Sequence, residues 1–467
     1  MRLPSSRHTL VASSLTLIPA LYLACSPVKN NSRLRNAADD IFVAVFDKKT
    51  DTDPVMLVST PAKVDADLCL TARDGTCDAA AQKFPLEEYS NTGGRFIYRP
   101  ATAPNLSTFQ DYLLVNKTGA QMLRFRLRVP GSNDTLEQVL GRITVKTLQD
   151  ELMFLTQDKF NGRLAGTPEN DQLADFLIDE LKKLNIAPVF GEYRQRFNMT
   201  VGPTSGTMSS NIVGLIEGSD PQLKNEYVVI GAHMDHTGTL EKGYTCSQGT
   251  SGDRICNGAD DNGSGTIALL NVAKSLASVR SSLKRSVFIM WFSGEEQGLI
   301  GSRHYVANPA VPLAKHVFMI NLDMVGYAKT FGNAIAAIGT TTAPWADSTA
   351  RAISKRYPNY KMKFTDKVEG GSDHAPFMNK GIPGIFYHTG VSNNPNYHRT
   401  SDHVEKIDFD GMLTASKIAL ETVVAAGSAP ELSRPNGFNL SDPALKYVSD
   451  AEAAKGCHYL TDYKYVD

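Results

Sequence analysis

From about residue 147 onward, short apolar runs alternate with amphipathic helical patterns, and this alternation limits the fold more than any other feature. Runs such as "EYVVIGAH" and "HVFMINLD" have strand length and contain few polar residues. Strands that are apolar on both sides are buried on both faces of a sheet. Intervening segments such as "PENDQLADFLIDELKKLNI" carry apolar residues three and four positions apart, as packed helices do. Residues 147–427 therefore predict an α/β domain whose sheet is covered by helices.

Residues 39–145 have a different pattern. Short apolar or alternating runs such as "IFVAVFD" and "MLRFRLRV" are separated by turn-forming stretches such as "SNTGG" and "PGSND". No helical period of useful length and no catalytic cluster stand out in this segment. We expect a β-rich accessory domain, a small sandwich or barrel, whose function the sequence does not indicate.

The first 25 residues have the features of an export signal. Arg2 and Arg7 precede the apolar run "TLVASSLTLIPALYLAC", which ends on a small residue before Cys25. The run is too short and too rich in serine to favour a membrane-spanning helix. It is similar to a bacterial lipoprotein signal, in which Cys25 would become lipidated and attach the protein to a membrane; an ordinary signal peptide cleaved nearby is the alternative. We expect an exported protein: a periplasmic or outer-membrane-anchored lipoprotein, or a secreted one.

Export would bring the cysteines into an oxidising compartment, where they are candidates for disulfides. The simplest pairs are local: Cys69 with Cys77, and Cys246 with Cys256. Cys457, in a C-terminal tail at 428–467, is then left single. A bridge between Cys246 and Cys256 would narrow the entrance to any site that the loop 237–258 borders.

The charge of the chain excludes one class of function. The 467 residues contain 48 Lys and Arg and 49 Asp and Glu, which gives a net charge of −1 with both signs well mixed. General nucleic-acid binders usually show a basic excess. We therefore expect no nucleic-acid partner.

Polar residues that can bind a metal follow several of the predicted strands. In α/β sheets, ligands bind beyond the carboxyl ends of the strands. A single such residue is usually structural, but here five groups converge. Carboxylates packed at one rim would repel one another unless a cation neutralised them. Histidine and carboxylate without cysteine suit zinc in a hydrolytic site. The residues are His233, Glu295 with Glu296, Asp323, His398, and the aspartates 260 and 261 of "GADDNGSG".

Two other chemistries find little support. No G-x-S-x-G elbow lies at a strand-to-helix turn, so a serine nucleophile of that type is not indicated. The loop "GADDNGSG" is rich in glycine but lacks the lysine of a phosphate-binding loop, and its two aspartates would repel phosphate.

These motifs, with the upstream segment "GRLAGTPEN", resemble the di-zinc aminopeptidase family of the bacterial leucyl aminopeptidase type, metallopeptidase family twenty-eight. Glutamate carboxypeptidase and glutaminyl cyclases are related to it. The resemblance covers roughly residues 147–427 and is carried most specifically by "GEEQGLIGS" and "GADDNGSG". It implies the zinc exopeptidase fold, a mixed, mostly parallel sheet flanked by helices, and two Zn²⁺ ions as cofactors.

Carried over position by position, the resemblance implies two ligand sets. One zinc would be held by His233, Asp261 and Asp323. The other would be held by Asp261, Glu296 and His398. Asp261 would bridge the ions, which in such pairs lie about 3.5–4 Å apart. The peptide bond that follows Asp261 is often cis in the family.

The resemblance also assigns the residues beside the metals. Glu295 would be the general base that takes a proton from a metal-bridging water and passes it to the leaving amine. Asp235 would orient the imidazole of His233. Tyr397 would donate to the oxyanion, although packing alone would also explain an aromatic residue there. Asp260 is expected to be a loop or supporting residue, and the remaining histidines to be structural or exposed: His236, His304, His388 and His403.

The function expected from these residues is that of a zinc-dependent metallo-aminopeptidase, which hydrolyses N-terminal residues from peptide substrates. A carboxypeptidase or another amidohydrolase on the same scaffold is an open alternative, as is an inactive binding protein. The intact ligand sets and Glu295 argue against an inactive protein. Neither side-chain specificity nor oligomeric state is indicated.

Overall fold

The computed structural model describes eight strands between residues 35 and 127, residues 136–430 except 366–369 and 391–393, and Asp65 and Leu432. The chain divides into two compact units, Met1–Asp134 and Thr135–Asp467. The predicted signal with Cys25, as well as Cys77 and Cys457, lie outside the described residues. Cys69 is in a described strand, but its side chain is not described, so its pairing with Cys77 stays a prediction. The units divide before residue 145, the expected end of the first domain, because Val139, Leu140 and Ile143 join the core of the second unit.

The first unit contains a sheet of eight antiparallel strands in the order β1-β2-β3-β6-β5-β4-β7-β8. Its two end strands contact each other, which indicates a sheet that curls back on itself. The expected β-rich region is thus present in the described strands: β1 (Arg35–Asn36), β2 (Ile41–Val45), β3 (Met56–Thr60), β4 (Ala66–Leu70), β5 (Lys83–Thr92), β6 (Arg95–Pro100), β7 (Gln110–Asn116) and β8 (Gln121–Leu127).

The second unit is built on a nine-stranded mixed sheet in the order β10-β11-β13-β12-β14-β17-β15-β16, with β9 paired to β11. Its centre is parallel: β12 lies between β13 and β14, and β14 pairs in parallel with β17. Antiparallel partners flank this centre. The strands are β9 (Ala187–Pro188), β10 (Arg194–Asn198), β11 (Met208–Ile216), β12 (Tyr227–His233), β13 (Ser286–Phe292), β14 (His316–Leu322), β15 (Ala334–Ile338), β16 (Lys361–Phe364) and β17 (Gly384–His388).

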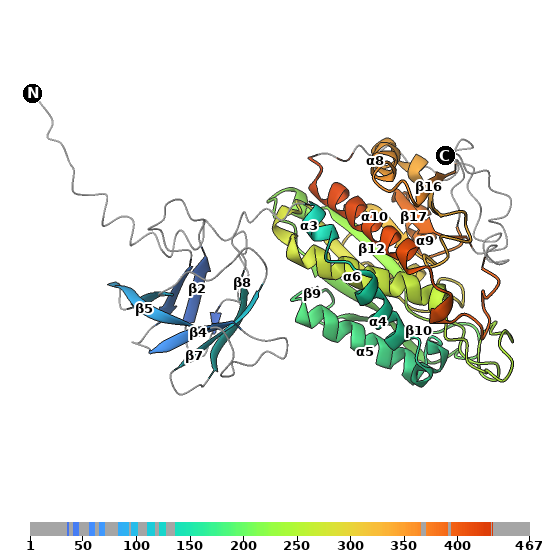
Figure 1. The fold of residues 1–467 in the computed structure, drawn as a ribbon, viewed down its shortest axis with the longest axis horizontal. Coiled ribbons are helices and arrows are strands. Elements are labelled where there is room, and N and C mark those ends of the chain that lie inside the picture. The colour runs from blue at the N-terminus through green and yellow to red at the C-terminus, as the bar shows by residue number, and fades with distance from the viewer. Residues whose placement is uncertain are drawn as a thin grey trace, which may run out of the picture. The chain divides into compact units, whose positions relative to one another are not determined.

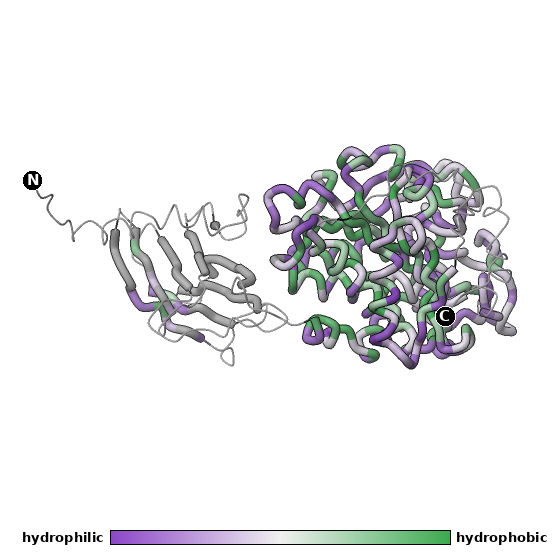
Figure 2. The backbone as a smooth tube through the Cα atoms, turned by 90° about the horizontal axis from the view of Figure 1, so that it is seen from above, coloured by the Kyte–Doolittle hydropathy of each residue, from purple (hydrophilic) through white to green (hydrophobic). Residues whose placement is uncertain are grey.

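Helices cover both faces of this sheet. On one face, α3–α6, α8 and α10 pack against alternate residues of the central strands, such as Val228 and Ile230 of β12. On the other face, α7 and α9 pack against the intervening residues, such as Val229. In Figure 1, α6 and α10 lie in front of the strands, and Figure 2 shows apolar segments in the interior of the unit. The helices are α3 (Leu136–Leu140), α4 (Val145–Leu155), α5 (Pro168–Lys183), α6 (Gly265–Ser278), α7 (Ile300–Ala307), α8 (Pro344–Ser354), α9 (His374–Met378) and α10 (Phe409–Ser428).

Helix α5 illustrates how the sequence specifies these elements. Thr167 caps the helix by accepting a hydrogen bond from the backbone N–H of Asn170, and Pro168 occupies the first turn. Leu173, Leu177 and Leu181, four residues apart, are fully buried against the core. The apolar spacing and the N-terminal signals thus both predict the helix that is observed.

The fold class expected for the second unit is confirmed: a mixed sheet with a parallel centre, flanked by helices. The elements not foreseen are mostly short or at the periphery, namely β9, β10, β16, α3, α7 and α9. Helix α3 lies in the segment 39–145, where no helix was expected. Among the residues that the structure describes, no helix combines the length and apolar character needed to cross a bilayer.

Candidate metal centre

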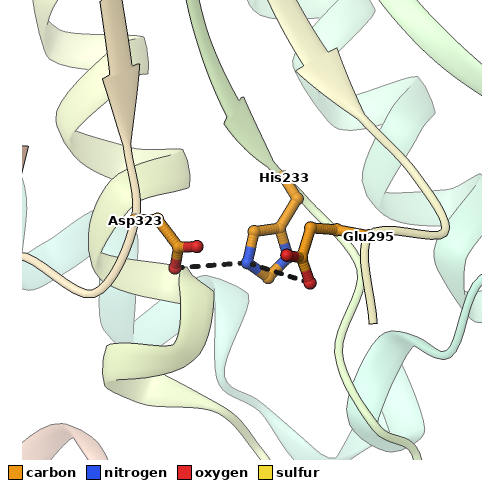
Figure 3. Close-up of side chains that lie close together, drawn as sticks. All are labelled: His233, Glu295 and Asp323. Atoms are coloured by element: carbon orange, nitrogen blue, oxygen red, sulfur yellow. Dashed lines mark hydrogen bonds and ion pairs between the residues drawn. The ribbon is translucent and has the colours of Figure 1, made fainter. Parts of the chain in front are cut away.

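The parallel centre of the sheet brings four expected site residues to one rim. His233 is the last residue of β12, and Asp323 directly follows β14 on one side of it. Glu295 and Glu296 follow the end of β13 on the other side. Figure 3 shows the side chains of His233, Asp323 and Glu295 converging from these neighbouring strand ends.

The first group surrounds Nε2 of His233. This atom lies 3.3 Å from Oδ1 of Asp323, 3.5 Å from Oδ1 of Asp261 and 3.9 Å from Oε2 of Glu295. The side chain of His233 is 1% exposed, so bulk water does not separate these groups. The structure thus brings together the three residues expected for one zinc, with Glu295 beside them.

The second group surrounds Nε2 of His398. This atom lies 2.9 Å from Oε2 of Glu296 and 3.1 Å from Oδ2 of Asp261. Asp261 therefore directs one carboxylate oxygen toward each histidine. This is the arrangement that a bridging ligand requires.

The loop that carries Asp261 is held from three sides. It is an irregular turn of helix, Ala259–Ser264, with a cis peptide bond between Asp261 and Asn262 as expected. The carboxylate of Asp402 accepts hydrogen bonds from the backbone N–H groups of Asp260 and Asp261, at 3.1 Å each. The side-chain amide of Asn262 donates to the carbonyl of Leu322 at 3.0 Å and so ties the loop to the end of β14.

Arg163, from the segment "GRLAGTPEN", also holds this loop through hydrogen bonds to its backbone. It is 1% exposed, and its guanidinium donates to backbone carbonyls on two segments. These are Met234 at 3.0 Å, next to His233, and Asn257, Gly258 at 2.7 Å and Asp261 at 3.1 Å. Burial lowers the pKa of Arg163 to about 10, which still leaves it charged at neutral pH. The cation thus fixes the spacing between His233 and Asp261.

The carboxylate of Asp260 is directed toward hydrogen-bond donors outside the two groups around His233 and His398. Its Oδ1 accepts from the N–H of Gly326 at 2.8 Å, and its Oδ2 accepts from the amide of Asn394 at 2.9 Å. The expectation that Asp260 is a supporting loop residue agrees with this orientation.

Asp235 contacts His233 mainly through its main chain. Nδ1 of His233 lies 3.2 Å from the carbonyl of Asp235 and 3.7 Å from its carboxylate, because the chain turns directly after the strand. The carboxylate instead accepts from the N–H of Glu295 at 3.3 Å. A carbonyl can only accept, so Nδ1 of His233 donates, and its Nε2, which faces the carboxylates, is the nitrogen available to a metal.

The ring of Tyr397 stacks on the imidazole of His398, with ring centroids 3.8 Å apart. It also packs against a small apolar cluster that includes Met324 and Phe386. Its position beside the second group is thus explained by packing, and its role as an oxyanion donor stays a prediction.

His236 belongs to the second group, although it was expected to be structural or exposed. It is fully buried, and its Nδ1 lies 2.7 Å from Oε1 of Glu296 and 3.8 Å from Oδ2 of Asp261. Burial lowers its pKa well below the ordinary value, with the charge of Arg163 adding to the effect, so His236 is neutral. The signal that could have identified it is its place in "HMDH", three residues after His233.

The electrostatics of the site reflect several acids buried together. Burial, reinforced by Asp323 and other carboxylates, raises the pKa of Glu295 well above its ordinary value. Burial and the charge of Asp261 raise the pKa of Glu296 to about 7. Burial alone would lower the pKa values of His233 and His398, but the charges of the neighbouring carboxylates outweigh this effect. The pKa of His233 therefore rises well above its ordinary value, and that of His398 rises to about 10.

These groups fit a pair of divalent cations. Without a cation, protons must compensate the buried negative charge, and the raised pKa values express that need. Nε2 of His398 is a buried nitrogen close to two carboxylates, yet none of the described residues forms a hydrogen bond of good geometry with it. Imidazole nitrogen with carboxylate oxygen is a donor set suited to zinc.

Comparison with known proteins gives a consistent result. Residues 211–423 match Peptidase family M28. The chain is 28% identical over 283 residues to a probable leucine aminopeptidase of Trichophyton verrucosum (strain HKI 0517), covering 59% of this chain and 69% of the relative. It is 26% identical over 305 residues to a probable leucine aminopeptidase of Arthroderma otae (strain ATCC MYA-4605 / CBS 113480), covering 64% and 76%.

Solved structures share the fold. The Legionella pneumophila LapA aminopeptidase aligns with a TM-score of 0.50 at 19% identity, covering 79% of this chain and 100% of its own. BSAP, a zinc aminopeptidase from Bacillus subtilis, aligns with a TM-score of 0.50 at 17% identity, covering 62% and 97%. At these identities the likeness concerns the fold, and it agrees with the expected zinc exopeptidase architecture.

Replacing Arg163 tests its place in the site. Arg163→Met leaves four buried carbonyls without their charged donor, so we expect the free energy of unfolding to fall by about 3 kcal/mol or more. Arg254→Met is the matched control, because Arg254 is exposed and pairs with exposed Glu241. For it we expect a change within about 0.5 kcal/mol. Urea denaturation of both variants measures the difference, and equal stabilities would contradict the role given to Arg163.

Proposed function

We propose that the chain, whose residues 211–423 match Peptidase family M28, is a zinc-dependent exopeptidase of the aminopeptidase type. It would hydrolyse N-terminal residues from peptides. The observation that carries this proposal is the carboxylate of Asp261, whose two oxygens face His233 and His398. The similarity to probable leucine aminopeptidases supports an amino-terminal over a carboxy-terminal action.

Five residues would hold the two zinc ions. His233 and Asp323 would bind one, Glu296 and His398 the other, and Asp261 both. When bound, zinc acts as a Lewis acid that polarises the scissile carbonyl and lowers the pKa of the attacking water. Ser372 holds Asp323 by donating to its Oδ2 at 2.7 Å, which leaves Oδ1 facing His233. His236 holds Glu296 in the same way, through Oε1.

Glu295 would transfer the proton. Its carboxylate lies beside His233, and its backbone is fixed by the hydrogen bond to Asp235. It is not needed as a ligand in either group, so it is available to accept a proton from the attacking water. Donating that proton to the leaving amine nitrogen would complete hydrolysis and restore the carboxylate.

The ligand and proton-transfer roles lead to one test of activity. The purified protein should release the amine from aminoacyl amides, lose this activity in a chelator and recover it with added Zn²⁺. Zinc measured per chain, alongside activity on a panel of aminoacyl amides, tests the two-ion count. Activity restricted to acyl peptides with a free C-terminus would indicate a carboxypeptidase instead. Metal-loaded, folded protein that hydrolyses none of these substrates would reject the proposal.

Removing the proton acceptor should separate catalysis from metal binding. Glu295→Gln keeps the shape of the side chain but cannot accept the proton, so we expect kcat/KM to fall by about 10²–10⁴-fold while zinc content is kept. Glu405→Gln, at an exposed position, is the control and should behave as the parent protein. If Glu295→Gln loses both ions, or keeps substantial activity, the assigned role is wrong.

We also propose that the protein is exported and attached to a membrane through a lipid on Cys25. The support is the sequence of residues 1–25. The mature protein should begin at Cys25 and be found in the membrane fraction, and Cys25→Ser should move it to the soluble fraction. Mass spectrometry of the N-terminal peptide checks this, and an N-terminus at residue 1 would contradict it.

A further inference from the structure

The segment between His233 and Asp261 contains a disulfide-bonded loop, residues 245–256, that contacts His398. Oγ1 of Thr245 lies 3.0 Å from Nδ1 of His398. The N–H and the hydroxyl of Ser247 donate to the carbonyl of His398 at 2.9 and 2.8 Å. The N–H of Thr400 donates back to the carbonyl of Ser247 at 2.9 Å. The loop thus holds both the side chain and the backbone of this histidine.

The contact with Thr245 determines which ring nitrogen of His398 carries the hydrogen and which one is available to a metal. Oγ1 of Thr245 also lies 2.5 Å from the carbonyl of Tyr244, which can only accept a hydrogen bond. The single hydroxyl hydrogen therefore goes to Tyr244. Nδ1 of His398 must then be the donor to Thr245, which leaves Nε2 as the coordinating nitrogen toward Asp261 and Glu296.

The backbone on both sides of this contact lies in the left-handed region. Thr245 has φ +68° and His398 has φ +54°. A β-branched residue is rarely found there, and such conformations persist where the surroundings hold them. The reciprocal hydrogen bonds between the loop and residues 398–400 are those surroundings.

The disulfide anchors the loop to a buried position. Thr245 and Ser247 are exposed, so burial alone does not hold them. Cys246 lies between them and is bonded to Cys256, which is fully buried and donates from its N–H to the carbonyl of Gly238 at 3.0 Å. Cys256 directly precedes the carbonyls that Arg163 holds, and the chain then continues to Asp261. One covalent bond therefore joins the segment that carries Asp261 to the segment that holds His398.

We infer that Thr245 is a positioning residue for His398 and that the disulfide between Cys246 and Cys256 keeps it in place, so that this loop sets the affinity for the second zinc ion. The inference rests on the proposed function, since it concerns one of the two proposed ions. It assigns the loop a role in building the site, beyond bordering its entrance.

Zinc titration against a chromophoric chelator tests the inference. The parent protein should show two dissociation constants, and Thr245→Ala should raise one of them by about 10–100-fold while leaving the other unchanged. Thr245→Ser keeps the oxygen and should restore the parent value. Thr250→Ala, an exposed threonine of the same loop, is the control and should change neither constant. The double variant Cys246→Ala with Cys256→Ala should weaken the same ion as Thr245→Ala.

The unchanged constant shows that the rest of the site remains folded. The inference is overturned if Thr245→Ala binds both ions as the parent does, or if both constants rise together, as general destabilisation would cause. A parent protein that binds fewer than two ions would refute the ion pair of the proposed function, and the inference would fall with it. The zinc titration of the parent protein thus distinguishes failure of this inference from failure of the proposed function.

Discussion

The position of one carboxylate, that of Asp261, determines whether the two halves of the candidate centre form a single site. Its oxygens lie 3.5 Å from Nε2 of His233 and 3.1 Å from Nε2 of His398. No regular element fixes this residue. Three separate contacts do so instead: Asp402 accepts from the loop's N–H groups, Arg163 donates to its carbonyls, and Asn262 ties it to β14. The bridging geometry is therefore a property of tertiary packing.

The charges around this carboxylate explain why the site requires a cation. Arg163 is a buried positive group beside this loop, but it donates to the carbonyl of Asp261 rather than to its carboxylate. Its hydrogen bonds therefore organise the backbone and leave the carboxylate oxygens of Asp261 facing the two histidines. The carboxylates remain buried together, and the raised pKa values of Glu295 and Glu296 show that they cannot all ionise unaided. Divalent ions would supply the missing charge.

Part of this arrangement could be predicted from the sequence and part could not. Continuous apolar runs identify β12, β13 and β14, and parallel neighbours end at one rim, so the approach of His233, Asp323 and Glu295 follows from pattern. Asp261 and His398 lie in loops whose path no periodicity specifies, and family resemblance was needed to place them. His236, Asp402 and Thr245 were missed, because each acts through a contact between loops far apart in the chain.

The ligands at strand ends, which the sequence pattern predicts, are also held more firmly than His398, which lies in a loop. In the first group, His233 and Asp323 stand at strand ends of a buried, hydrogen-bonded sheet, which fixes their backbone positions. The second depends on His398, whose left-handed backbone is kept by an exposed loop. A loop with little burial pays a larger ordering entropy each time it closes on its partner. A covalent link from that loop to buried Cys256 reduces this cost, which gives a physical reason for a disulfide beside the more weakly supported half of the site.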